Sequence, residues 1–172
     1  MKLVFRKLEG RKGHDVGREL LAEVYREETG EALPAIEIGE WGKPYFPGSK
    51  WHFSISHTQN YAFCVLAEEN VAVDAEELSR PARLQLAEKV LSDSEKRQFE
   101  AAEDQNRAFL TFWVLKEAEA KLSGRGLRLY PNHTHFSLDD PRVVEMEGCL
   151  VAVFRASDET QGAASPTIVG ER

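Results

Sequence analysis

An aromatic, an acidic and a basic residue recur at helical spacing near the middle of the chain. Within residues 104–122, which we predict to form a helix, Trp113, Glu117 and Lys121 stand four positions apart. Residues at this spacing share one side of an α-helix, so a carboxylate and an amine project beside an anchoring ring. Such a pair suits a site for a metal ion and phosphate, with Lys121 meeting the phosphates. The alternative is an ordinary ion pair on a solvated helix surface.

Two further carboxylates follow a short apolar run. Residues 71–73 are apolar and include two valines, which favours a buried strand, and Asp74-Ala75-Glu76 comes directly after them. The two-residue period of a strand puts Asp74 and Glu76 on one face. Together with Glu117 they could converge as oxygen ligands of Mg²⁺, which substrate phosphates usually complete. The alternative is that acidic residues after a strand form a turn or cap.

Two other segments present polar side chains at the ends of local structure. Lys43 stands between a permissive glycine and a rigid proline, which is how a turn projects a side chain. Residues 51–57 alternate apolar and polar side chains, which predicts a strand that ends in Ser56-His57. A single histidine at a strand end is more often a turn or surface residue, so the sequence pattern alone leaves its role open.

The elements that must position these residues are helices mixed with short strands. We predict helices over 15–30, 81–91, from Ser92 onward and 104–122, and strands over 51–57, 60–67, 71–74, 134–138 and within 143–155. Residues 39–48 are expected to be a loop, and Glu147-Gly148 the turn of a hairpin. The small and polar residues of 157–172 predict a flexible tail.

Composition and missing motifs narrow the classes of function. A net charge of −7 argues against a general nucleic-acid binder, and no apolar stretch approaches the roughly 18 residues that span a membrane. The first residues do not resemble a secretory signal, so a cytoplasmic location is expected. Cys64 and Cys149 lack the spacing of a zinc site. The motifs of serine hydrolases, P-loop proteins and dinucleotide-binding folds are missing from the sequence.

The order of four motifs resembles the Sfp type of 4′-phosphopantetheinyl transferases. These motifs are Trp41-Gly42-Lys43-Pro44, Phe53-Ser54-Ile55-Ser56-His57-Thr58, Val71-Ala72-Val73-Asp74-Ala75-Glu76, and Phe112-Trp113-Val114-Leu115-Lys116-Glu117-Ala118 with Lys121 and Gly124-Arg125-Gly126-Leu127. The resemblance covers about residues 11–130. Ala72 and Ala75 depart from it, because the family usually has a glycine and a branched residue there.

The resemblance implies an α+β fold of two similar lobes that form an intramolecular pseudo-dimer, the 4′-phosphopantetheinyl transferase fold. Residues 1–70 would be the N-terminal lobe, on the nucleotide side of the coenzyme A site. Residues 71–156 would be the C-terminal lobe with the metal and catalytic residues, and 157–172 the flexible tail. A pseudo-dimer of this kind implies a monomer.

The resemblance also implies a reaction. The family transfers the 4′-phosphopantetheine arm of coenzyme A to a serine of an apo acyl or peptidyl carrier protein, with Mg²⁺, and releases adenosine 3′,5′-bisphosphate. The resemblance implies that the metal ligands are Asp74, Glu76 and Glu117. The catalytic residues would be Glu117, which acts as the base, and Lys121. The residues that bind coenzyme A would be Arg18, Lys43, Ser56, His57 and Lys121. Two alternatives remain: a non-catalytic relative that binds coenzyme A or a carrier protein, and an α+β interaction domain whose charges are incidental.

Overall fold

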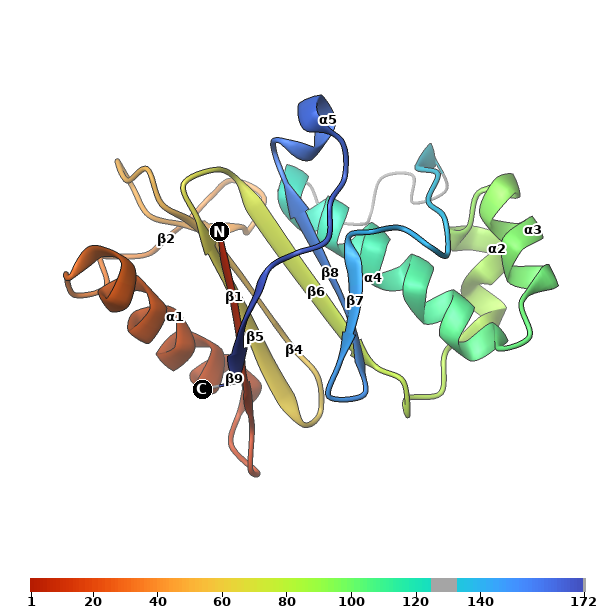
Figure 1. Ribbon diagram of the computed structural model, residues 1–172, viewed down its shortest axis with the longest axis horizontal. Helices are drawn as coiled ribbons and strands as arrows, with labels where there is room; N and C mark the ends of the chain where they lie inside the picture. The colour runs from red at the N-terminus through yellow and green to blue at the C-terminus, as the bar shows by residue number, and fades with distance from the viewer. Residues whose placement is uncertain (125–132, 172) are drawn as a thin grey trace.

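Two β-sheets stand side by side in the molecule (Figure 1). The computed structural model describes residues 1–124 and 133–171. The first sheet has the order β4-β5-β1-β9, formed by β1 (Lys2–Lys7), β4 (His52–His57), β5 (Tyr61–Ala67) and a parallel edge strand β9 (Ile168–Glu171). The second has the order β6-β8-β7, formed by β6 (Val71–Glu77), β7 (Val143–Met146) and β8 (Cys149–Arg155).

The two sheets meet where β4 lies against β6. On one face a single apolar cluster joins them, because Phe63 and Val65 of the first sheet pack with Val73, Val151 and Val153 of the second. The short strands β2 (Glu37–Ile38) and β3 (Pro44–Tyr45) form a separate hairpin. The predicted mixture of helices and strands is confirmed.

Helix α1 (Gly13–Thr29) covers the first sheet. Its buried residues, Leu20 and Val24 among them, recur at the helical period and face β1, β4 and β5, and Gly30 ends the helix with a φ of 75°. A Cβ on Gly17 would lie 2.5 Å from Cγ2 of Ile55. The absence of a side chain therefore lets α1 approach β4 closely.

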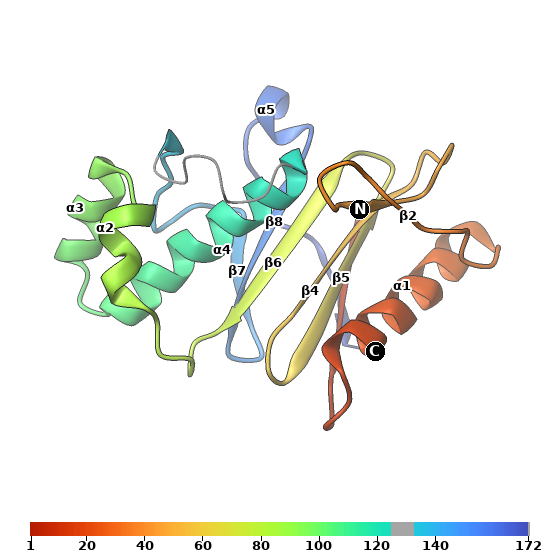
Figure 2. The ribbon, with the colours of Figure 1, turned by 180° about the vertical axis from the view of Figure 1, so that it is seen from behind.

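Helix α4 (Gln105–Ser123) covers the second sheet and crosses β6 and β8 in Figure 2. It buries Phe112, Leu115 and Ala118, and Gly124 ends it with a φ of 73°. Lys116 is also buried, and its Nζ lies 2.8 Å from Oε2 of Glu95 on α3 (Asp93–Ala101). That pair joins the two helices inside the protein.

Several local predictions are confirmed, and two are wrong. The helices predicted over 15–30 and 104–122, the strands over 51–57 and 60–67, and the hairpin at Glu147-Gly148 are present, and Ser92 opens α3 with a capping box. The helix predicted over 81–91 is shorter and irregular, consisting of a 3₁₀ turn, η1 (Leu84–Leu86), followed by α2 (Ala87–Val90), and the amide of Ala82 before it donates to Oδ1 of Asn106.

The strand predicted over 134–138 is absent from that described segment, because side chains bind its backbone. The amide of Phe136 donates to Oε1 of Glu95, and that of Leu138 donates to Oε1 of Gln98. The segment 157–172, predicted as a flexible tail, contains α5 (Asp158–Gln161) and β9. No helix of the described residues is long and apolar enough to cross a membrane.

Candidate functional site

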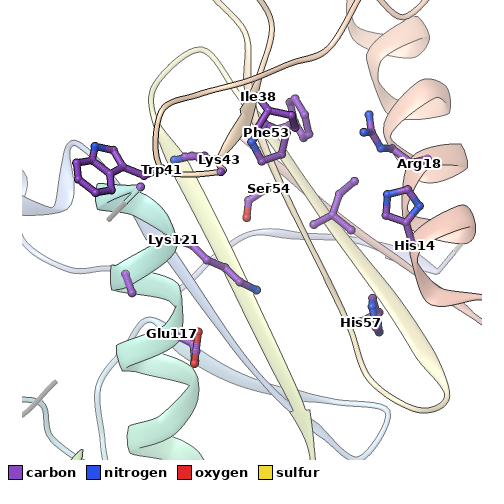
Figure 3. Close-up of a pocket in the computed structure, with 15 residues that line it drawn as sticks. His14, Arg18, Ile38, Trp41, Lys43, Phe53, Ser54, His57, Glu117 and Lys121 are labelled. Carbon is purple, nitrogen blue, oxygen red and sulfur yellow. The ribbon is translucent and has the colours of Figure 1, made fainter. Parts of the chain in front are cut away.

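A cavity of about 460 Å³ lies where the two sheets meet, between α1 and α4 (Figure 3). Five of the residues predicted from the sequence line it: Arg18, Lys43, His57, Glu117 and Lys121. Its wall also includes His14, Ile38, Trp41, Phe53 and Ser54. The cavity is thus lined by predicted residues from α1, from the segment around Lys43, from β4 and from α4, and its lining has more basic than acidic side chains.

Lys121, Asp74 and Ser56 are brought together from α4, β6 and β4. The Nζ atom of Lys121 lies 2.6 Å from Oδ1 of Asp74 and donates to the carbonyl oxygen of Val73 at 3.1 Å. The hydroxyl of Ser56 donates to the same Asp74 oxygen at 3.0 Å. Asp74 is 7 % exposed. Three elements that are distant in sequence therefore share one charged hydrogen-bonded cluster.

Glu117 lies one turn before Lys121 and faces the cavity (Figure 3). Burial raises the pKa of its carboxyl group, the Asp74 carboxylate raises it too, and Glu76 adds to this against the opposing effect of Lys121. Like charges close together disfavour ionisation of the group between them. A cation among these three carboxylates would offset their mutual repulsion.

The donor set suits Mg²⁺, since all three side chains offer carboxylate oxygens and they lie close enough to influence each other's charge. At present two are paired with cations, Asp74 with Lys121 and Glu76 with Arg80. Among the described residues, no group of three His, Cys, Asp or Glu side chains is gathered as a metal site. A metal ion would thus require these ion pairs to rearrange.

The other end of the cavity is basic and belongs to α1 and the end of β4. Arg18 and His14 are one turn apart on α1 and point toward the cavity, and His57 stands below them (Figure 3). A Cβ on Gly13 would lie 2.5 Å from the imidazole of His57, so this glycine makes room for the ring. The sequence analysis missed His14, although its i,i+4 spacing from Arg18 was a usable signal.

Lys43 turns its ammonium group toward the protein. Its Nζ donates to Oδ1 of Asn70 at 2.6 Å, to the carbonyl oxygen of Leu122 at 3.2 Å and to that of Val71 at 3.3 Å. Burial lowers the pKa of this amine to about 8. Its stem contributes to the cavity wall, while its charge is satisfied at the C-terminal end of α4.

Glu77 was also missed, because its neighbours are close only in the fold. It accepts hydrogen bonds from the hydroxyl of Thr58 at 2.6 Å and from the backbone and side-chain amides of Asn60 at 2.8 and 2.9 Å. Burial raises the pKa of Glu77, but these hydrogen bonds together bring it below the ordinary value. The carboxylate thereby fixes the turn that follows His57.

A second cavity of about 60 Å³ adjoins Glu76. It combines apolar side chains with two arginines and is lined by Glu76, Arg80, Ala82, Arg83, Leu86, Phe109, Leu110 and Trp113. The rings of Phe109 and Trp113 stack with centroids 6.0 Å apart. Residues 125–127 of the fourth sequence motif lie outside the described residues.

Known proteins identify the class to which this fold and site belong. A family described as the 4′-phosphopantetheinyl transferase superfamily matches residues 70–161, which include β6, α4 and β8. The chain belongs to this superfamily.

Individual proteins that are similar in sequence carry the same family name. A 4′-phosphopantetheinyl transferase of Bacillus subtilis is 28 % identical over 131 residues, which cover 71 % of this chain and 58 % of the relative. The 4′-phosphopantetheinyl transferase Sfp of Bacillus subtilis (strain 168) is 31 % identical over 93 residues, 52 % of this chain and 41 % of that protein. The 4′-phosphopantetheinyl transferase ffp of Bacillus subtilis is 30 % identical over 115 residues, covering 65 % and 50 %. The chain thus spans about half the length of these relatives.

Proposed function

We propose that the protein transfers the 4′-phosphopantetheine arm of coenzyme A to a serine of an apo carrier protein and releases adenosine 3′,5′-bisphosphate. The observation that carries this proposal is the cavity, with the cluster of Lys121, Asp74 and Ser56 beside Glu117 at one end and basic α1 residues at the other. An elongated anionic substrate with a reactive pyrophosphate matches this distribution of charge.

Binding of coenzyme A would use the basic groups of both lobes. Arg18 and His57 would contact the nucleotide and Lys121 the pyrophosphate, while the stem of Lys43 contributes to the cavity wall. Fixed positive groups stabilise the charge that develops on phosphate oxygens during transfer. Ser56 would act close to Lys121, with which it already shares the Asp74 oxygen.

Glu117 would act as the general base. Its carboxylate would accept the proton of the carrier serine hydroxyl as the serine oxygen bonds to the β-phosphorus, and the bond to the bridging oxygen breaks to release adenosine 3′,5′-bisphosphate. Asp74, Glu76 and Glu117 would hold Mg²⁺, which when bound supplies positive charge for the phosphate oxygens. Without the metal, burial and the Asp74 carboxylate raise the pKa of the Glu117 carboxyl group.

We also infer a two-lobed monomer, in which each lobe is one sheet with one covering helix. The surface around the second cavity, beside Glu76, would contact the carrier protein, since Arg80 and Arg83 suit an acidic partner and Trp113 an apolar contact. Arg83→Glu should raise the KM for the carrier several-fold and leave the KM for coenzyme A unchanged, measured by steady-state transfer kinetics. Equal effects on both constants would exclude this docking site.

The deciding experiment is the intact mass of an apo carrier protein after incubation with the protein, coenzyme A and Mg²⁺. A gain of roughly one phosphopantetheine arm that disappears with Glu117→Gln would establish the transferase and the role of Glu117. Binding of coenzyme A without a mass gain on several acyl and peptidyl carriers would favour the non-catalytic relative instead.

A further inference from the structure

The ammonium group of Lys43 already has hydrogen-bond acceptors within the protein, unlike that of a lysine whose donors are available to a phosphate. An ammonium group has three N–H donors, and Lys43 has three neutral oxygen acceptors within hydrogen-bond distance. Two belong to Asn70 and Val71, where β6 begins, and the third belongs to Leu122 in the last turn of α4. Its hydrogen-bonding capacity is therefore used within the protein.

The end of α4 favours a cation for two reasons. The last carbonyl groups of a helix lack helical partners, and the helix dipole is negative there. Asn70 supports the same point, because its Nδ2 also donates to the Leu122 carbonyl oxygen at 3.0 Å. The stem of Lys43 also lies beside Gly124, because a Cβ built there would be in ordinary van der Waals contact, 3.8 Å from Cβ and Cδ of Lys43.

The segment that carries Lys43 is anchored in the core at one point by Phe46, whose ring packs against Tyr25 and Phe53, whereas Trp41 and Tyr45 on either side of Lys43 are exposed. We call residues 39–48 the pocket loop; among the described strands, β3 pairs only with β2, in a two-stranded hairpin. Trp41 is 64 % exposed, and Trp41, Gly42 and Pro44 line the large cavity. Figure 3 shows the Lys43 nitrogen directed toward the end of α4 and away from the nitrogen of Lys121.

We propose that Lys43 is a positioning residue, which fastens the pocket loop to the end of α4 and so sets the width of the cavity between Trp41 and the helix that carries Glu117 and Lys121. Lys43 acts on the bound nucleotide through the loop, and its ammonium group contacts no phosphate. The consequence for coenzyme A rests on the proposed function, whereas the attachment of the loop does not.

The attachment is tested without any ligand by amide hydrogen exchange of the whole protein. Lys43→Met keeps the apolar stem and removes the ammonium group, and Asn70→Ala removes its closest acceptor from a residue outside the cavity lining. Both should speed exchange of residues 39–48 by about ten-fold, the size expected for losing a charged hydrogen bond. Lys50→Met is the matched control, because Lys50 is exposed and pairs with Glu68. It should leave this exchange unchanged.

Coenzyme A binding then separates positioning from direct contact. Each variant should lower the affinity for coenzyme A and the affinity for dephospho-coenzyme A by the same factor. The double variant should bind coenzyme A as tightly as Lys43→Met alone. KM for coenzyme A should rise more than kcat falls. Thermal melting of each variant checks that the remaining fold is intact.

Unchanged exchange in Lys43→Met overturns the proposal, whether or not affinity falls. A loss of affinity in Lys43→Met that Asn70→Ala does not share overturns it as well, because that pattern belongs to a direct phosphate contact. If the wild type does not bind coenzyme A, the proposed function is wrong. Faster exchange in the two variants would still support the attachment of the pocket loop.

Discussion

Helices α1 and α4 both hold side chains that line the cavity, but they are positioned in different ways. Helix α1 presents His14 and Arg18 from a surface that meets β4 through Gly13 and Gly17, so its site residues depend on close backbone approach. Helix α4 packs on the second sheet, and its Lys121 pairs with the buried carboxylate of Asp74. The basic end of the cavity is shaped by close backbone approach, whereas at the acidic end burial and the Asp74 carboxylate also raise the pKa of Glu117.

This comparison predicts the largest loss of stability at the buried charges of α4. Lys116→Met leaves Glu95, which is fully buried, without its cation. Removing one partner of a buried ion pair typically costs about 3–5 kcal/mol. Urea unfolding should show this loss for Lys116→Met. The double variant Lys116→Met, Glu95→Gln should recover part of it, and a single variant as stable as wild type would refute the buried-pair argument.

The next effect is on activity and not on folding. Glu117→Gln should lower the rate of carrier modification by about 10²–10⁴-fold, the usual contribution of a general base. Its melting temperature without ligand should equal or exceed that of the wild type, because a buried carboxylate among like charges is removed. Transfer kinetics and a thermal scan measure the two. Normal activity would contradict the assignment of the base.

On α1 the corresponding test is steric. Gly17→Ala places a Cβ 2.5 Å from Cγ2 of Ile55 and should destabilise the protein by about 1–3 kcal/mol. Adding Ile55→Ala removes the opposing methyl group, so the double variant should lose less than the sum of the two single losses. Chemical unfolding of the four proteins completes the cycle. Additive losses would mean that helix and strand are not in direct contact there.

The smallest expected effect concerns pH and the pocket loop. The pKa of Lys43 is lowered to about 8 by burial, from an ordinary value of 10.5, and His52 on β4 is a titratable neighbour whose own pKa is lowered by burial and by Lys43. Between pH 8 and 10.5 the unfolded chain holds this proton more tightly, so the Lys43 contribution to stability should rise with pH.

The difference in unfolding free energy between wild type and Lys43→Met, measured from pH 7 to 10, isolates that contribution, because the other groups titrate in both proteins. We expect the wild type to become more stable relative to Lys43→Met as the pH rises above 8. A constant difference would show that burial does not lower the pKa of this amine.

Local chemistry determined much of this protein. The apolar period of residues 16–24, the glycines at 30 and 124 and the alternation in residues 51–57 placed the helices and strands that surround the cavity. The two-residue spacing of Asp74 and Glu76, and the four-residue spacing of Glu117 and Lys121, identified the acidic end. These signals are readable because secondary structure depends on neighbours along the chain.

Tertiary structure alone decided which partners these groups take. Lys121 pairs with Asp74 47 positions away, and Lys43 donates to Leu122 79 positions away. The same holds for residues 134–138, whose backbone is bound by side chains of α3 and therefore forms no strand. The partner of a buried polar group is set by the path of the chain, because any nearby acceptor can satisfy it. Sequence periodicity carries no record of that choice.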